Sequence, residues 1–172
     1  CILSTILMLN ELIASNFDVN YIALHTSLET PILYKITALW AGQSGSLLFW
    51  LFVLSTYSLI VLFKSRNQID MGLPWVFITL SGVQLFFLII INFIENPFSP
   101  TTANFVITNG NGLNPLLQNL TMAIHPPILY LGYVGFTVPF AYGIGALVSK
   151  KIDLNWIIKI RRWSLIAWFF QS

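Results

Sequence analysis

The two histidines, His25 and His125, are the side chains of this chain best suited to bind a metal ion or to relay a proton. His125 is followed directly by Pro126 and Pro127, which open a long apolar run. Proline favours the first turn of a helix and pushes the residue before it toward an extended backbone. We therefore expect His125 to lie, extended, just before a helix that starts at Pro127. Three roles fit it at this stage: a metal ligand, a proton relay, or an interfacial imidazole bonded to a loop carbonyl.

Few partners are available for a metal site. Cys1 is the only cysteine, and no cluster of acidic residues accompanies the histidines. Only His25 could pair with His125, so a complete metal site built from this chain alone is not expected. If His125 binds a metal ion, it supplies one axial ligand, and the remaining ligands lie elsewhere.

The helix expected after Pro127 carries residues that suit a membrane. Tyr130 and Tyr133 fall within its first two turns, where aromatic rings anchor a span at the headgroups. Pro139 comes twelve residues after Pro127, which is roughly 18 Å along the helix at about 1.5 Å of rise per residue. The sequence therefore predicts a kink near the middle of this span.

A second stretch, 33–50 (LYKITALWAGQSGSLLFW), also leads into an apolar run. Gly42 and Gly45 permit a tight turn beside Trp40. This uncharged turn could contact a flat hydrophobic ligand through Trp40, or it could be a helix start packed on a neighbouring element. Further along, the hydroxyls of 55–58 and the amide of Gln84 are expected to form hydrogen bonds between helices.

The composition is that of a membrane protein. Hydrophobic residues make up 56% of the 172 residues and charged residues only 8%, whereas soluble domains carry about a quarter. The net charge of +2 indicates no nucleic-acid partner. Because a span needs about 20 apolar residues and must close its own backbone hydrogen bonds, the sequence predicts an all-α, polytopic transmembrane helix bundle. We expect one transmembrane domain, 1–172, with complete spans at 45–63, 74–94 and 127–148 and truncated spans at 1–13 and 163–172.

The loops between these spans differ in charge. Two of them hold seven of the eight basic residues: Lys64, Arg66, Lys150, Lys151, Lys159, Arg161 and Arg162. The other two, 14–44 and 95–126, hold only Lys35. Basic loops stay on the cytoplasmic side, so both histidines are expected on the outer, periplasmic side. No charged residue lies within a complete span, which disfavours an ion pathway through these helices.

Three segments together resemble a known family. These are NGNGLNPLLQNLTMAIHPPILYLGYVGFTVPFAYGIGAL (109–147), PILYKITALWAGQSGSLLFWLFVLS (31–55) and the basic KIRRWSLIAW (159–168). They resemble the CcmF/NrfE/CcsA haem-handling proteins of cytochrome c maturation, in which an LNPLLQ segment leads to an HPP helix start and a GSLLLW segment enters another helix. Both the CcmF and NrfE branches fit these residues.

The resemblance implies a haem lyase subunit in the bacterial inner membrane, or equally in the mitochondrial inner membrane. Such a protein carries a b-type haem within the membrane and a second haem at the outer face. His125 matches the HPP histidine, so the resemblance makes it an axial ligand of the outer haem iron, supported by Pro126, Pro127, Tyr130 and Trp40. No residue of the chain is implied to be catalytic.

The same resemblance implies partners and a reaction. The haem chaperone CcmE would deliver haem, which would be joined by thioether bonds to the CxxCH thiols of apocytochrome c, with the thiol-handling protein CcmH taking part. Two other functions stay open: a haem or small-molecule transporter with His125 on its path, and a membrane scaffold with an incidental histidine.

The chain departs from the family pattern in several places. It begins without Met inside an apolar run and ends within another, so we expect a fragment, inactive as a haem lyase alone. The Trp-rich WWD segment and three further haem-ligating histidines are expected beyond Ser172. Gln43 and Ser44 stand where many members place a histidine or an acid, and His25 matches no family ligand.

Overall fold

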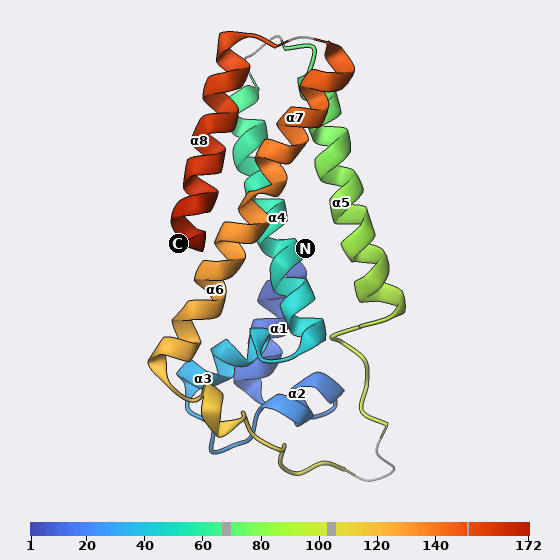
Figure 1. Ribbon diagram of the computed structural model, residues 1–172. Coiled ribbons are helices and arrows are strands. Elements are labelled where there is room, and N and C mark those ends of the chain that lie inside the picture. The colour runs from blue at the N-terminus through green and yellow to red at the C-terminus, as the bar shows by residue number, and fades with distance from the viewer. Residues whose placement is uncertain (67–69, 103–105, 151) are drawn as a thin grey trace. The chain divides into compact units, whose positions relative to one another are not determined.

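The computed structural model of the chain describes residues 1–66, 70–102, 106–150 and 152–172 (Figure 1). These residues form helices, together with one isolated antiparallel β-bridge between Val19 and Pro100. The predicted all-α class is therefore confirmed. The elements are α1 (Ile2–Ala14), α2 (Asn20–His25), α3 (Ile32–Thr37), η1 (Ala38–Trp40), α4 (Gln43–Ser65), α5 (Leu73–Phe93), η2 (Pro115–Leu117), α6 (Leu120–Gly135), α7 (Thr137–Ser149) and α8 (Leu154–Gln171).

Three helical segments are long and apolar enough to cross a membrane: α4, α5, and α6 with α7 taken together over Leu120–Ser149. They coincide with the three complete spans that the sequence predicts, although their ends differ by up to seven residues. The described chain divides into two compact units. Unit 1 comprises 1–52 and 88–126, and unit 2 comprises 53–87 and 127–172.

Unit 1 contains both loops that are expected to face outward. The loop 14–44 contains the short helices α2, α3 and η1. Its backbone is joined to the other loop: the Asn20 amide donates to the Ser99 carbonyl at 2.9 Å, and the Asn111 amide donates to the Ala23 carbonyl at 2.8 Å. These bonds hold the two predicted outer loops side by side.

The core of unit 1 lies between α1, α2 and η1. Its buried side chains are Met8, Leu12, Phe17, Tyr21, Ile22, Ala23, Ala38, Leu39, Leu48 and Leu113. Lys35, only 8% exposed, donates from Nζ to the Ser15 hydroxyl at 2.6 Å. Ser15 ends α1 in the left-handed conformation, with φ of 56°. The one basic residue of the predicted outer loops is thus buried against the end of a helix.

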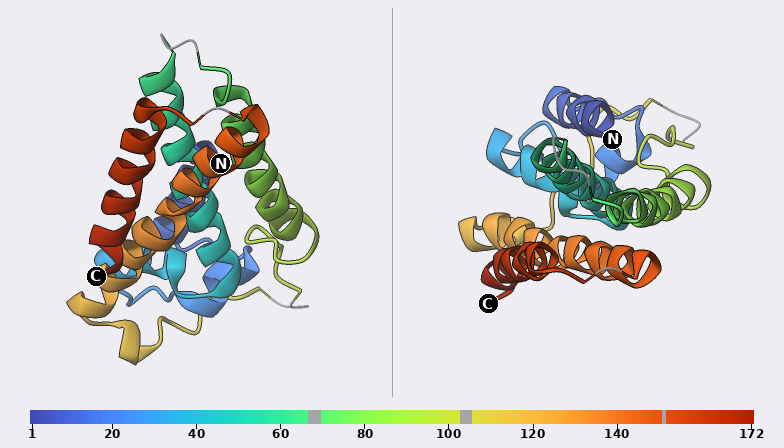
Figure 2. Two further views of the ribbon diagram at one scale, coloured as in Figure 1. Left: turned by 45° about the horizontal axis from the view of Figure 1, so that its top comes forward. Right: turned by 90° about the horizontal axis from the view of Figure 1, so that it is seen from above.

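Unit 2 contains the basic loops. In it α7 and α8 contact each other (Figure 2). The Trp156 indole donates from Nε1 to the Tyr142 carbonyl at 2.9 Å, and Lys159 and Asp70 form an ion pair of 3.0 Å. The stretch after α4 and the start of α8 therefore contact one another.

Polar side chains also join helices within unit 2. The Tyr57 hydroxyl of α4 donates to the Leu131 carbonyl of α6 at 2.9 Å. Gln84 of α5 donates from Nε2 to the Ser58 hydroxyl of α4 at 2.7 Å. The predicted role of Tyr57, Ser58 and Gln84 in bonding helix to helix agrees with these contacts.

The start of α6 corrects one prediction. The helix begins at Leu120 rather than at Pro127, because the Asn119 side chain accepts a hydrogen bond from the Met122 amide at 3.1 Å and caps it. His125 is therefore helical, not extended. The preference of proline for a first turn is a tendency that this local cap overrides.

The start of α8 corrects another prediction. Asp153 caps this helix by accepting from the Trp156 amide at 2.7 Å, so α8 begins at Leu154 instead of Trp163. Lys159, Arg161 and Arg162 lie on a helix and not in the loop expected for them; Lys151 lies outside the described residues.

The predicted kink at Pro139 has a counterpart. The helix is interrupted at Phe136, between α6 and α7. Pro139 has no amide hydrogen to donate to the Gly135 carbonyl, and its ring crowds that group. The interruption therefore falls where the missing bond would have closed the turn.

Candidate functional site

His125 lies in the second turn of α6, at its unit 1 end, and is exposed. Within the described part of the chain, no hydrogen bond or ring contact engages its imidazole. Its nitrogen atoms therefore remain available to an external partner. A histidine already bonded through both nitrogens would have to give up a bond before it could ligate a metal.

The two prolines after His125 alter the helix that carries it. At the seventh and eighth positions of α6, they cannot donate to the carbonyls of Met122 and Ala123, which lie one turn earlier. Those two carbonyls lose their usual helical donors beside the imidazole. Pro126 and Pro127 thus create a locally polar stretch of backbone at His125 and restrict its φ and ψ angles.

Trp40 ends the short helix η1 and is half-buried. Its ring lies at 5.4 Å from the ring of Phe49, and its carbonyl accepts from the Ser46 hydroxyl at 3.1 Å. Trp40 and His125 both belong to unit 1, whereas Pro127 and Tyr130 belong to unit 2. In the described residues no hydrogen bond or ring contact joins His125 to Trp40, so their joint role in a site stays a prediction.

The glycine-rich turn packs on α2. The Tyr21 hydroxyl donates to the Ala38 carbonyl at 2.7 Å and accepts from the Gly42 amide at 3.0 Å. A Cβ atom on Gly42 would lie 2.5 Å from Nε2 of His25, and one on Gly45 would overlap the Tyr21 hydroxyl. Both glycines are needed because the turn approaches α2 too closely for a side chain.

His25 has a fixed place in this packing. Its Nδ1 lies 2.8 Å from the Tyr21 carbonyl, and its ring stacks on the Tyr21 ring at 4.3 Å. Because a carbonyl can only accept, Nδ1 is the donor in this hydrogen bond. The sequence did not single out Tyr21, although its spacing of four residues from His25 on a short helix was a usable signal.

The residues do not form a complete metal site by themselves. In the described ranges, no group of three or more His, Cys, Asp or Glu side chains is placed to hold an ion. An exposed, unbonded imidazole nevertheless fits haem, since haem iron takes only one or two protein ligands and the porphyrin supplies the rest.

Comparisons with known proteins agree with one another. The family model "Cytochrome C assembly protein" matches residues 40–172. The chain is 38% identical over 168 residues to the cytochrome c-type biogenesis protein CcmF of Escherichia coli, covering 97% of this chain and 26% of that protein. It is 36% identical over 161 residues to NrfE of Haemophilus influenzae, covering 91% of this chain and 24% of that protein.

A solved structure is similar as well. The structure titled "Cytochrome c Heme Lyase CcmF" matches with a TM-score of 0.77 and 27% identity over 96% of this chain and 25% of that one. The chain spans about a quarter of the length of these relatives. It has the helices of a multi-pass membrane protein, and by sequence and fold it belongs to the cytochrome c assembly protein family.

Proposed function

We propose that this chain is part of a membrane haem lyase that binds haem at the outer face of the bacterial inner membrane and attaches it to apocytochrome c. In this proposal His125 is an axial ligand of the haem iron. Membership of the cytochrome c assembly family supports the role, and the exposed, unbonded imidazole of His125 supports the residue. A b-type haem, delivery by CcmE and cooperation with CcmH belong to the same proposal.

The chemistry divides between haem and protein. Haem supplies the iron for ligation and the vinyl groups to which CxxCH thiols add. His125 positions the iron through one ligand bond, and its helix, stiffened by Pro126 and Pro127, limits how far that ligand moves. Trp40 offers an aromatic surface, and Tyr130 anchors α6 near the headgroups.

The orientation rests on charge. The two loops joined in unit 1 carry one basic residue, Lys35, which is buried, whereas the other seven basic residues of the sequence fall within 64–73 and 149–162. By the positive-inside rule, these two basic stretches are cytoplasmic and the loops 14–44 and 95–126 are periplasmic. A transporter receives less support, because the complete spans contain no charged residue.

The test uses the full-length protein in cells that depend on it for c-type cytochromes. His125→Gly should abolish most cytochrome c assembly and reduce the haem recovered with the protein. Added imidazole should restore part of the haem binding and change its absorption spectrum, because free imidazole can replace the missing ligand. The matched control is Thr121→Ala, an exposed position one turn earlier on α6, which should leave both readouts unchanged.

Each outcome bears on the proposal. Normal cytochrome c assembly with unchanged haem spectra in the His125→Gly protein would remove His125 from the site. Loss of assembly with full haem binding and an unchanged spectrum would show that His125 acts on another step, as a transporter's path residue would.

A further inference from the structure

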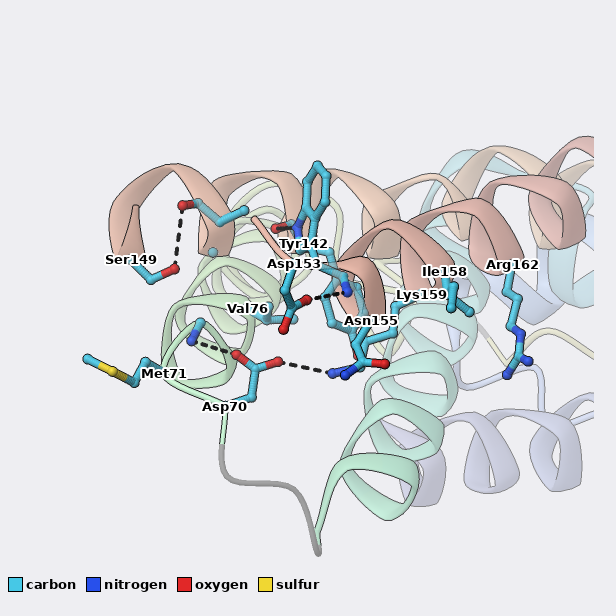
Figure 3. A pocket seen from close by; sticks show the side chains of 14 residues that line it. Asp70, Met71, Val76, Tyr142, Ser149, Asp153, Asn155, Ile158, Lys159 and Arg162 are labelled. Atoms are coloured by element: carbon cyan, nitrogen blue, oxygen red, sulfur yellow. Dashed lines mark hydrogen bonds and ion pairs between the residues drawn. The ribbon is translucent and has the colours of Figure 1, made fainter. Parts of the chain in front are cut away.

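A second feature of the molecule lies within unit 2. Two neighbouring cavities open between the ends of α4, α5, α7 and α8. The larger, of about 690 Å³, includes Asp70, Tyr142, Asp153, Lys159 and Arg162 in its lining. Figure 3 shows Lys159 and Arg162 projecting from the same side of α8.

The smaller cavity, of about 330 Å³, shares three lining residues with the larger one: Tyr142, Lys159 and Arg162. Its size falls in the range of roughly 300–1,000 Å³ that small-molecule sites occupy. The two cavities together offer an extended space with walls from several helices.

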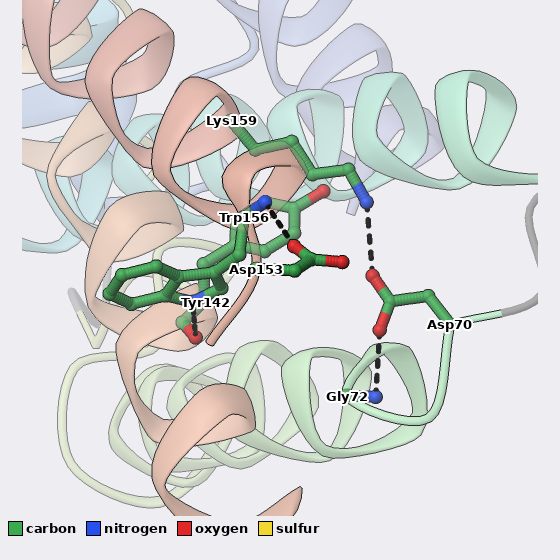
Figure 4. A network of polar contacts seen from close by, with 6 residues as sticks. All are labelled: Asp70, Gly72, Tyr142, Asp153, Trp156 and Lys159. Atoms are coloured by element: carbon green, nitrogen blue, oxygen red, sulfur yellow. Dashed lines mark hydrogen bonds and ion pairs between the residues drawn. The ribbon is translucent and has the colours of Figure 1, made fainter. Parts of the chain in front are cut away.

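The charges in the two cavities differ. Within the larger one, Asp70 pairs with Lys159 at 3.0 Å and also accepts from the Gly72 amide at 2.9 Å, while Asp153 caps α8 (Figure 4). The lining of the smaller cavity holds Lys64, Lys159 and Arg162 and no acidic side chain. Three cationic side chains therefore line this cavity, and one of them, Lys159, is paired with a carboxylate of the larger cavity.

Two of these cations are held over aromatic rings. Lys64 Nζ lies 5.8 Å from the centre of the Trp163 ring, and Lys159 Nζ lies 5.8 Å from the centre of the Tyr142 ring. Such contacts orient the two ammonium groups at the cavity. Arg162 is exposed, and no hydrogen bond or ion pair to it is found among the described residues.

Apart from the buried Ser65, the remaining walls of the smaller cavity are apolar. Val61 is buried, and Leu165 and Ile166 are 52% and 41% exposed. Lys64 is in the last turn of α4, a helix of membrane-spanning length, so the cavity lies where a span ends. Cations above exposed apolar side chains at the end of a span match the chemistry of a lipid, with an anionic headgroup beside an acyl chain.

We propose that the smaller cavity binds the phosphate group of an anionic phospholipid from the surrounding leaflet. Lys64 and Arg162 contact the phosphate, Lys159 divides its charge between the phosphate and Asp70, and Leu165 and Ile166 contact the acyl chain. A phospholipid headgroup and a free phosphate would both present phosphate oxygens to these cations. The apolar wall favours the lipid, because only the lipid has an acyl chain to contact it. The site goes beyond the proposed haem lyase function and does not depend on haem binding.

The experiment uses the full-length protein in nanodiscs or detergent. Binding of phosphatidylglycerol is compared with binding of phosphatidylcholine of the same chain length by native mass spectrometry. The phosphatidylglycerol preference should fall about fivefold for each cation removed in Lys64→Gln and Arg162→Gln. Arg161→Gln, an equal charge change at an exposed neighbour that lines neither cavity, should leave the preference unchanged.

A gain of affinity gives a second, independent readout. Asp70→Asn releases Lys159 from its ion pair, so the preference for phosphatidylglycerol should rise, whereas a purely structural role for the pair would not raise it. Arg162→Lys should retain most of the preference, which guards against loss through misfolding.

Three results would overturn the site. These are equal binding of the two lipids by the unaltered protein, an equal loss with Arg161→Gln, and full competition by millimolar inorganic phosphate. The last of these would assign the cavity to a free anion. Unchanged haem binding in these variants is expected, so failure here would leave the haem proposal standing.

Discussion

The phenolic oxygen of Tyr21 lies 3.0 Å from the amide nitrogen of Gly42, so a side chain of α2 holds the turn that begins α4. The same oxygen donates to the Ala38 carbonyl at 2.7 Å. A single hydroxyl of α2 therefore bonds both η1 and the turn that follows it, about 20 residues further along the chain, within the core of unit 1.

Removal of this hydroxyl should destabilise unit 1. In Tyr21→Phe the half-buried Gly42 amide loses its acceptor, which should cost about 1 kcal/mol of unfolding free energy. The measurement is the unfolding of the purified full-length protein in detergent. Tyr34→Phe is the control, because no hydrogen bond to the Tyr34 hydroxyl is found in the described chain; equal losses in the two variants would contradict the assignment.

Gly42→Ala should be more harmful than a typical glycine replacement. The new Cβ atom would lie 2.5 Å from Nε2 of His25 and 2.9 Å from the Tyr21 ring, so the turn must shift. We expect lower thermal stability and faster proteolysis of the outer loops.

The control for this change is Gly82→Ala, where a Cβ atom has nothing within 4 Å. Within helix α5, alanine is favoured over glycine by about 1 kcal/mol, so Gly82→Ala should be neutral or stabilising. If Gly42→Ala were also neutral or stabilising, the conclusion that the turn lies too close to α2 to hold a side chain would be contradicted.

The contact between Glu29 and Asn109 should make the outer loops sensitive to acid. Asn109 donates from Nδ2 to both carboxylate oxygens, at 3.0 and 3.2 Å, and this bonding lowers the pKa of Glu29 below its ordinary value of 4.5. A lowered folded-state pKa contributes stability that is present above pH 4.5 and is lost as the pH falls through the folded value.

Hydrogen exchange in the full-length protein measures this effect. Protection around Glu29 and Asn109 should fall below about pH 4.5, and Glu29→Gln should remove that pH dependence. A wild-type profile that stays flat through this window would show that the carboxylate contributes nothing. Glu95→Gln, at the other predicted outer loop, serves as a control for general acid effects.

The bond between Gln84 and Ser58 should show energetic coupling within the membrane. A double-mutant cycle with Gln84→Leu and Ser58→Ala should give a coupling of about 0.6 kcal/mol, the magnitude found for hydrogen bonds between membrane helices. The readout is unfolding in detergent. Thr79 bonds only its own helix, at the Trp75 carbonyl, so Thr79→Ala paired with Ser58→Ala should be additive.

The sequence by itself determined the all-α class of the protein and indicated its three long apolar helices. Apolar length is a local property, and the cost of an unpaired backbone group in lipid leaves helices as the solution. The difference in basic residues between the loops can likewise be read from short stretches of sequence, without knowledge of the fold. The family resemblance rested on contiguous segments, and it was confirmed by the match to residues 40–172.

The helix ends were within reach of the sequence but depended on a choice between competing local signals. At α6 we expected a proline start at Pro127, whereas the Asn119 side chain caps the helix seven residues earlier, at Leu120. At α8 we expected a loop because the segment is rich in basic residues. The Asp153 side chain instead caps a helix that begins at Leu154.

Only the tertiary structure decided which distant residues meet. Tyr21 and Gly42 are 21 positions apart, and Asp70 and Lys159 are 89 positions apart. Neither pair carries a periodic signal, because such contacts depend on how helices pack and not on the residues between them. The same holds for the cavity lined by Lys64, Lys159 and Arg162, which exists only because the ends of α4 and α8 fold together.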